Sequence, residues 1–204
     1  RGMLETVKKR KNITFIENIF VSGILKNQHG SYGIQCIYKN IKRSIHSKFV
    51  VIATGGIGEL YANTTNATIS TGDGIAMAYR AGAKIKDMEF VQFHPTALNA
   101  PGHGHFLISE AVRGEGGILK NENGIAFMND YHELKDLAPR NIVAKAIFEE
   151  SAKQGNDKIY LDVTHLGEKF IKFRFPNIYN ECMKKNIDIV NEYIPIVPVQ
   201  HYII

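Results

Sequence analysis

Side chains able to bind an anion and to move protons are concentrated in two neighbouring stretches of the sequence. In the first, residues 90–98, a histidine stands directly before a proline; in the second, residues 109–116, an acid and a base are three positions apart. The candidate residues are Gln92, His94, Thr96, Ser109, Glu110 and Arg113. Their spacing matches neither a known metal-ligand set nor a Ser-His-Asp order. We therefore expect them to act on an anionic ligand.

Two later residues belong with these stretches. Arg140 follows Ala138-Pro139 at the predicted start of a helix, where the helix dipole disfavours a cation. A cation placed at that end indicates a functional role. His201 follows a predicted extended run, residues 194–199. Both residues carry groups that can hold a carboxylate or transfer a proton.

The composition indicates a globular chain with one good core or two small ones. Of the 204 residues, 44% are hydrophobic and 22% are charged, and no apolar run approaches the length of a membrane span. No signal peptide opens the sequence, so we expect a cytoplasmic protein. The net charge of +5 is dispersed without interleaved aromatic residues, which argues against nucleic acid as a partner.

Cysteine and histidine spacing gives little support for a metal site. Cys36 and Cys182 lie far apart and form no C-x-x-C motif, so we expect buried thiols rather than a disulfide framework. Residues 102–105 read Gly-His-Gly-His, but no carboxylate or cysteine is close in sequence. We therefore assign no metal.

The first half of the sequence predicts a small antiparallel sheet and then a buried strand. Branched and aromatic residues between turn-like sequences predict strands at 20–25, 33–38 and 41–45. Residues 48–56 form an apolar run that ends in small residues, typical of a strand buried on both faces. A helix capped by residues 70–74 follows. Its start suits an anion or a ribityl hydroxyl, although an ordinary capped helix explains the pattern equally well.

The second half predicts mainly helices joined by short extended segments. An apolar stripe predicts a helix from Arg140 that stops at Gly155. Further elements are expected at residues 160–163 (strand), 168–174 and 177–186 (helices) and 194–199 (extended chain). The fold class that these elements predict is α+β.

Several of these motifs, taken in order, resemble the flavoprotein family of succinate dehydrogenase, fumarate reductase and L-aspartate oxidase. The resemblance covers almost the whole chain and is carried by residues 53–56, 70–74, 92–96, 109–116, Arg140 and 201–202. Within the family, four segments most resemble the oxidase branch: residues 94–98, 138–143, 175–179 and 195–202. Each motif alone is modest, but the series is specific.

The resemblance implies two domains and an FAD cofactor. Residues 1–87 resemble the later portion of a FAD-binding α/β domain that contains the antiparallel β-meander, and residues 88–204 resemble an α+β capping domain. The expected cofactor-binding residues are Ala53, Thr54, Gly55, Gly56 and Asp73.

The chain departs from the family pattern at its ends. The N-terminal G-x-G-x-x-G unit and the C-terminal segment that completes the flavin domain are missing, so we expect a piece of a longer protein that does not hold FAD by itself. Ile203-Ile204, which follow the segment that carries His201, also stand where the family usually has small residues ending in two glycines.

The chemistry implied by the resemblance is the oxidation of L-aspartate to iminoaspartate in NAD (quinolinate) biosynthesis. Its catalytic residues would be Arg140, Glu110 and Arg113, and its dicarboxylate-binding residues His94, Ser109, His201, Gln92 and Thr96. Ser109 stands where relatives usually carry threonine. Aspartate and fumarate are the expected ligands, and a pathway partnership with quinolinate synthase is also implied.

Alternative interpretations stay open. The chain could belong to a succinate dehydrogenase or fumarate reductase flavoprotein subunit, or be a structural piece without activity. At the level of single residues, His94 could be a satisfied core histidine, Glu110 and Arg113 a surface pair, and Arg140 a helix-end ion pair.

Overall fold

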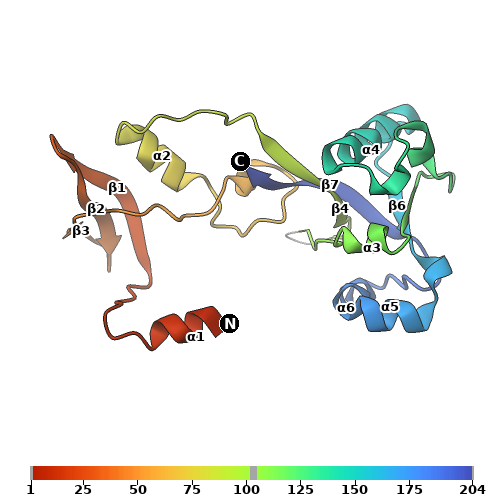
Figure 1. Cartoon of the computed structure of the whole chain (residues 1–204), viewed down its shortest axis with the longest axis horizontal. Helices are drawn as coiled ribbons and strands as arrows, with labels where there is room; N and C mark the ends of the chain where they lie inside the picture. Colours follow the sequence, from red (N-terminus) through yellow and green to blue (C-terminus); the bar gives the residue numbers. More distant parts are fainter. Residues whose placement is uncertain (1, 102–104, 204) are drawn as a thin grey trace. The chain divides into compact units, whose positions relative to one another are not determined.

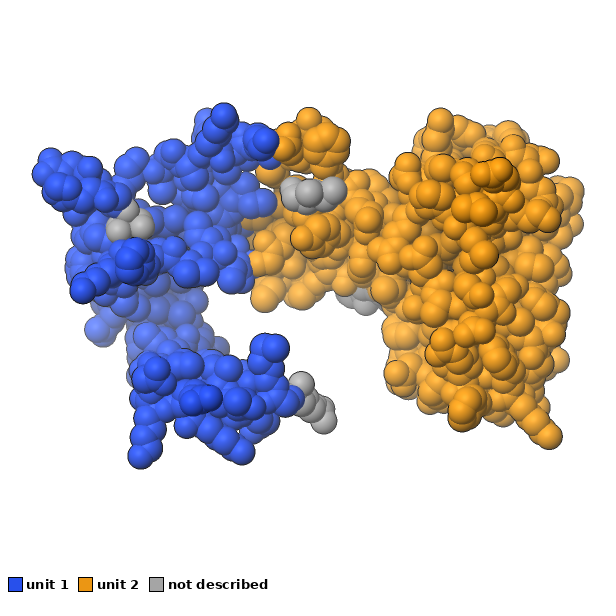
Figure 2. All heavy atoms as spheres, in the orientation of Figure 1, with its two compact units in different colours: residues 1–54, 73–86 blue, residues 55–72, 87–204 orange. Residues whose placement is uncertain are grey.

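The computed structural model describes residues 2–101 and 105–203 and divides into two compact units (Figure 2). Unit 1 comprises residues 1–54 and 73–86, and unit 2 comprises residues 55–72 and 87–204. Residues 55–72 thus cluster with the second unit, although they precede the domain boundary expected at residue 87. The expected boundary itself stays a prediction.

Unit 1 contains a three-stranded antiparallel sheet of order β1-β2-β3 and two helices (Figure 1). The elements are α1 (Gly2–Lys8), β1 (Ile19–Asn27), β2 (Gly30–Tyr38), β3 (Ile41–His46) and α2 (Asp73–Arg80). Lys39 and Asn40, between β2 and β3, have φ angles of 51° and 61°, which are typical of a type I′ hairpin turn. The predicted β-meander is confirmed.

The strand predicted at residues 48–56 is wrong. The structure assigns no strand there, and Phe49 and Val51 are 83% and 88% exposed. A strand needs a neighbour for its backbone N–H and C=O groups, and none of the described strands pairs with this run. An apolar sequence therefore did not suffice to produce a buried strand.

Unit 2 contains a four-stranded sheet of order β4-β7-β6-β5 with antiparallel pairs. Its strands are β4 (Val91–Leu98), β5 (Ile118–Lys120), β6 (Ile159–Asp162) and β7 (Ile194–Ile203). Its helices are α3 (Ala111–Gly114), α4 (Arg140–Gln154), α5 (Glu168–Arg174) and α6 (Pro176–Lys184), and its 3₁₀ turns are η1 (Gly58–Leu60), η2 (Phe127–Asp130), η3 (Lys135–Leu137) and η4 (Thr164–Leu166). Helix α4 packs along β4 and β7, and α5 packs on α6.

The core of unit 2 confirms the helical prediction for the second half of the sequence. Val143, Ala146 and Ile147 form the apolar stripe of α4, and each is at most 1% exposed. The helix ends at Gly155, which has a φ of 71° and serves as a left-handed cap. The predicted helix at 177–186 begins one residue earlier and ends two residues earlier in the structure.

The cysteines and the Gly-His-Gly-His sequence can be compared with the structure for the residues that it describes. Cys36 and Cys182 are buried and unpaired, as expected. Of the Gly-His-Gly-His sequence, residues 102–104 lie outside the described residues, and His105 contacts Asn63 Oδ1 at 2.9 Å. Among residues 2–101 and 105–203 we find no group of three metal-binding side chains, and no helix there is long and apolar enough to cross a membrane.

Candidate active site

His94 lies in β4 and is 1% exposed. The backbone N–H of Thr96 donates a hydrogen bond to its Nδ1 atom over 3.2 Å, so the hydrogen of the neutral ring resides on Nε2. Burial, followed by the positive charge of Arg140, lowers the pKa of His94 to about 4. The ring is therefore neutral near pH 7 and can donate through Nε2–H.

His201 lies on β7, the strand that pairs with β4, and this pairing brings the two histidines together. Their ring centroids are 5.4 Å apart in an edge-to-face arrangement. Burial and the nearby Arg140 lower the pKa of His201 as well. Its Nδ1 atom lies 2.9 Å from the hydroxyl of Thr65. The structure therefore brings together two histidines that the sequence separates by about half of the chain.

Arg140 occupies the first turn of α4, directly after Pro139, as predicted. Its Nε donates to Glu110 Oε2 over 2.8 Å, and its Nη1 donates to Gln92 Oε1 over 2.9 Å. Two fixed acceptors orient the planar guanidinium. Within the described part of the chain, Nη2 has no hydrogen-bond acceptor, which leaves it for a ligand.

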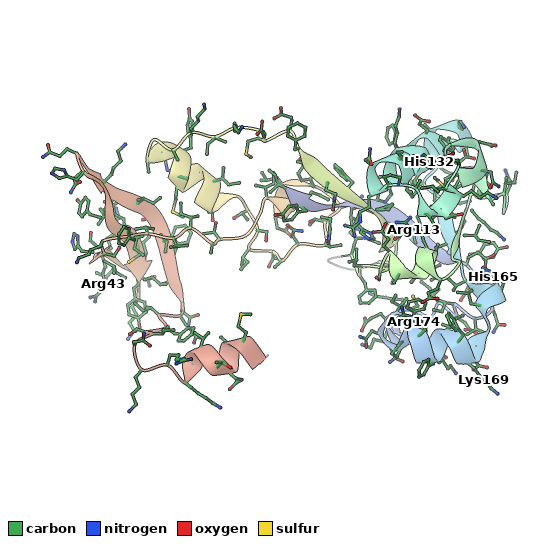
Figure 3. The ribbon with its side chains drawn as sticks, in the orientation of Figure 1. Arg43, Arg113, His132, His165, Lys169 and Arg174 are labelled. Carbon is green, nitrogen blue, oxygen red and sulfur yellow. The ribbon has the colours of Figure 1, made fainter. Side chains whose placement is uncertain are left out.

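Glu110 stands between two arginines. Arg113, labelled in Figure 3, comes from α3, and its Nη2 lies 3.3 Å from Glu110 Oε1. The hydrogen bond from Arg140 is the main cause that lowers the pKa of Glu110. The three predicted catalytic residues are therefore in continuous contact, and Glu110 is ionised near neutral pH.

Asp136 is a neighbour of this chain of charges that the sequence did not reveal. Its backbone carbonyl accepts a short hydrogen bond from Arg113 Nη1, and its carboxylate accepts the Leu119 N–H over 2.7 Å. Burial lowers the pKa of Arg113 and raises the pKa of Asp136. Arg113 is only 2% exposed, so these contacts compensate part of the cost of burying its charge.

Ser109 and Thr96 have local structural contacts. The Ser109 hydroxyl accepts the Ala111 N–H over 3.3 Å at the start of α3 and is otherwise exposed. Thr96 is fully buried, and its hydroxyl donates to the Ile108 carbonyl over 3.0 Å. The hydroxyl of Thr96 is thus already in use, whereas its N–H fixes His94. Direct ligand contacts of both residues stay predictions.

The predicted cofactor residues are divided between the units, and each part is described by itself. Ala53, Thr54 and Asp73 belong to unit 1, where a Cβ added to Gly74 would lie 1.9 Å from Thr54 Oγ1. In unit 2, Gly55 has a φ of 80°, which side chains rarely adopt. Gly74 thus allows Thr54 to pack against the start of α2, and Gly55 allows a left-handed turn, both of which are compatible with a backbone that binds phosphate or ribityl groups. Contacts of these residues with FAD stay predictions.

Gln92 and Arg140 also line a groove of about 900 Å³ between α4 and the β4-β7 pair. Its walls include Phe90, Phe93 and Phe148, whereas neither active-site histidine lines it. The groove therefore touches the Arg140 side of the site.

Comparisons with known proteins identify the family of this chain. A family model described as a FAD binding domain matches residues 1–204. L-aspartate oxidase 1 of Ralstonia nicotianae is 44% identical over 209 residues, and L-aspartate oxidase of a Synechocystis species is 48% identical over 174 residues. These matches cover 98% and 83% of this chain but only 39% and 32% of the relatives' own length. A solved quinol-fumarate reductase with menaquinol molecules is 36% identical with a TM-score of 0.87, and the match covers 99% of this chain and 38% of that chain.

Proposed function

Because this chain belongs to the family of FAD-binding domains, we propose that it is part of an L-aspartate oxidase. The proposed activity is the FAD-dependent oxidation of L-aspartate to iminoaspartate in NAD biosynthesis. The observation that carries it is the contact chain of Arg140, Glu110 and Arg113 beside the paired rings of His94 and His201. The identity of 44% and 48% to two oxidases favours aspartate over other dicarboxylates.

In this proposal the two histidines bind the carboxylates of a four-carbon diacid. His94 presents Nε2–H, because its Nδ1 already accepts a backbone hydrogen bond. His201 lies next to it, and both pKa values are lowered, so neither ring gains a proton that would change its hydrogen-bonding role. Aspartate and fumarate present carboxylates at similar separation, and both fit this pair.

The proton that leaves the substrate reaches Glu110 through Arg140: the guanidinium gives a proton to the ionised carboxylate as it takes one from the substrate. Glu110 and Gln92 hold the guanidinium in one orientation, so that a near-attack geometry needs little further ordering. The lowered pKa of Glu110 means that it passes on a proton rather than keeping it. The buried Arg113 supports the charge of Glu110 from the protein side.

The bound flavin supplies the acceptor for the hydride from the carbon beside the amine. Thr54, Gly55 and Gly56, with Ala53 before them and Asp73 at the start of α2, would hold part of it. The residues of this chain alone do not complete such a site in our proposal. The flavin absorbance of the purified chain tests this, since a yellow protein after gel filtration contradicts it.

The activity is tested by adding substrates anaerobically to the protein made from the whole reading frame and following the flavin absorbance. L-aspartate should bleach the oxidised flavin and yield the imino acid, whereas succinate should bleach it slowly. Bleaching by succinate with no response to aspartate overturns the oxidase assignment.

A second candidate is the flavoprotein subunit of a succinate dehydrogenase or fumarate reductase. The TM-score of 0.87 and the identity of 36% to the quinol-fumarate reductase support it, because a shared fold does not distinguish the two activities. A purely structural role is the third candidate. The pathway partnership with quinolinate synthase and the cytoplasmic location stay predictions.

A further inference from the structure

Residues 63–66 bind the end of β7 that carries His201, although they lie far from it in the sequence. The backbone N–H of Gln200 donates to the Asn63 carbonyl over 2.9 Å. The Thr65 N–H donates back to the Gln200 carbonyl over 3.2 Å. These two hydrogen bonds hold the backbone of residues 63–65 against Gln200. The Thr65 side chain therefore has a defined place beside His201, the residue after Gln200.

Side chains on either side of Thr65 strengthen this attachment. The Thr64 hydroxyl lies 3.0 Å from Gln200 Oε1 inside the protein, and Asn66 Nδ2 donates to the His201 carbonyl over 2.9 Å. A Cβ added to Gly58 would lie 2.5 Å from the side chains of both Thr64 and Asn66, so η1 packs closely under them. The segment is therefore held by its neighbours as well as by β7.

The Thr65 hydroxyl meets the His201 ring directly. Its oxygen lies 2.9 Å from His201 Nδ1, and among the described residues it has no other hydrogen-bond partner. A partly buried hydroxyl hydrogen needs an acceptor, and an unprotonated Nδ1 is the acceptor that this contact offers. The same ring atom of His94 accepts from the N–H of Thr96. Two different donors thus act on equivalent atoms of the two histidines.

We propose that Thr65 is a positioning residue of the dicarboxylate site: its hydroxyl donates to Nδ1 of His201 and so keeps the ring hydrogen on Nε2. Without that donor, the hydrogen of the neutral ring is free to occupy Nδ1, and Nε2 then repels a carboxylate instead of binding it. Thr65 also fixes the ring orientation. The identity of the ligand rests on the proposed function, whereas the tautomer does not.

The test is a long-range ¹⁵N–¹H NMR spectrum of the whole 204-residue chain with labelled histidine, recorded near pH 7. His94 and His201 are assigned by the loss of their signals in His94→Gln and His201→Gln. We expect both rings to show a protonated Nε2 and an unprotonated Nδ1. A His201 ring with its hydrogen on Nδ1 overturns the proposal, and this result needs no Thr65 variant.

Two variants then isolate the hydroxyl. Thr65→Val keeps the branched shape and removes the donor, so the His201 signals should shift towards a mixture of tautomers, whereas those of His94 stay in place. Thr65→Ser should restore the wild-type pattern. Unchanged His201 signals in a folded Thr65→Val protein contradict the proposal. Because no reading depends on turnover, a failure of the aspartate assay with the tautomers intact counts only against the proposed function.

Discussion

The two compact units of this chain bury their apolar side chains to very different extents. In unit 2, twenty buried apolar residues form one cluster around β4 to β7 and α4 to α6. In the described part of unit 1, Cys36 and Met77 are the buried apolar residues, and the sheet leaves Phe20 and Ile41 more than half exposed. Unit 1 therefore depends mainly on backbone pairing, whereas unit 2 is stabilised by a packed core.

The unit with the packed core also differs from the other unit in its proposed functional residues. The proposed catalytic and dicarboxylate-binding residues all lie in unit 2, where packing holds them in one geometry. Three of the five proposed cofactor residues, Ala53, Thr54 and Asp73, lie in unit 1. Within this chain, the residues proposed for the chemistry therefore lie in the unit with the packed core.

The largest expected effect follows from the core. Leu161 in unit 2 is fully buried, so Leu161→Ala should lower the free energy of unfolding by about 2–5 kcal/mol. Val51 in unit 1 is 88% exposed, so the matched variant Val51→Ala should change it by about 0.5 kcal/mol or less. Urea denaturation followed by circular dichroism gives both values. Equal losses contradict the comparison.

The next largest effect is a loss of stability at acidic pH. The pKa of His94 is lowered from 6.5 to about 4, so the folded state binds its proton less readily than the unfolded state. Its contribution is fully present above pH 6.5 and is lost as the pH falls towards 4, by about 3 kcal/mol in total. Unfolding free energies measured between these pH values should show this slope. His94→Gln should reduce it, whereas His29→Gln, at an exposed position of unit 1, should leave it unchanged.

A substitution of Arg140 tests whether this residue of unit 2 serves catalysis or ligand binding. In the protein made from the whole reading frame, Arg140→Lys should lower kcat for the proposed oxidation on the order of 100-fold, because lysine keeps the charge but loses the planar fork shared by Glu110 and Gln92. The dissociation constant for fumarate should change much less. Equal losses in both quantities make Arg140 a binding residue. Lys145→Arg, on the exposed face of the same helix, is the matched control.

The smallest effect lies in the hairpin turn of unit 1. Asn40 has a φ of 61°, and glycine adopts this conformation without a Cβ clash. Asn40→Gly should therefore stabilise β2 and β3 by up to about 1 kcal/mol, because the relief of the left-handed strain exceeds the extra entropy of glycine in the unfolded chain. Amide hydrogen exchange should slow in these strands and stay unchanged in β6. Faster exchange in β2 shows that the asparagine side chain is needed in the turn.

Local patterns predicted much of the fold. The β-meander and the helix that ends at Gly155 follow from turn residues and apolar spacing, which act over a few positions. The strand predicted at residues 48–56 was wrong because the burial of a strand depends on a neighbouring strand, and an apolar run does not specify that neighbour. Sequence periodicity describes the element and not its partner.

Only part of the candidate site could be predicted from the sequence, because some of its residues are recognisable only by their contacts with distant residues. His94, Glu110 and Arg140 carry unusual chemistry at recognisable positions, so the sequence pointed to them. Thr65 and Asp136 carry common side chains, and their roles arise only from contacts with residues distant in the sequence. The Thr-Thr-Asn sequence of residues 64–66 was the signal available for Thr65, and the charged turn around Asp136 gave none.

The position of β4 at the edge of its sheet also bears on how the site forms during synthesis. β7 is the one neighbour of β4 among the described strands, and His94 pairs with Val199, about half of the chain later. Closing so long a loop is slow, and both edges of β4 stay without a strand partner until β7 has left the ribosome. The antiparallel pairing of β5 with β6, which are closer to each other in the sequence, can precede it. The two histidines therefore meet only after the residues from β4 to β7 have been made, and a shorter nascent chain cannot bind its ligand early.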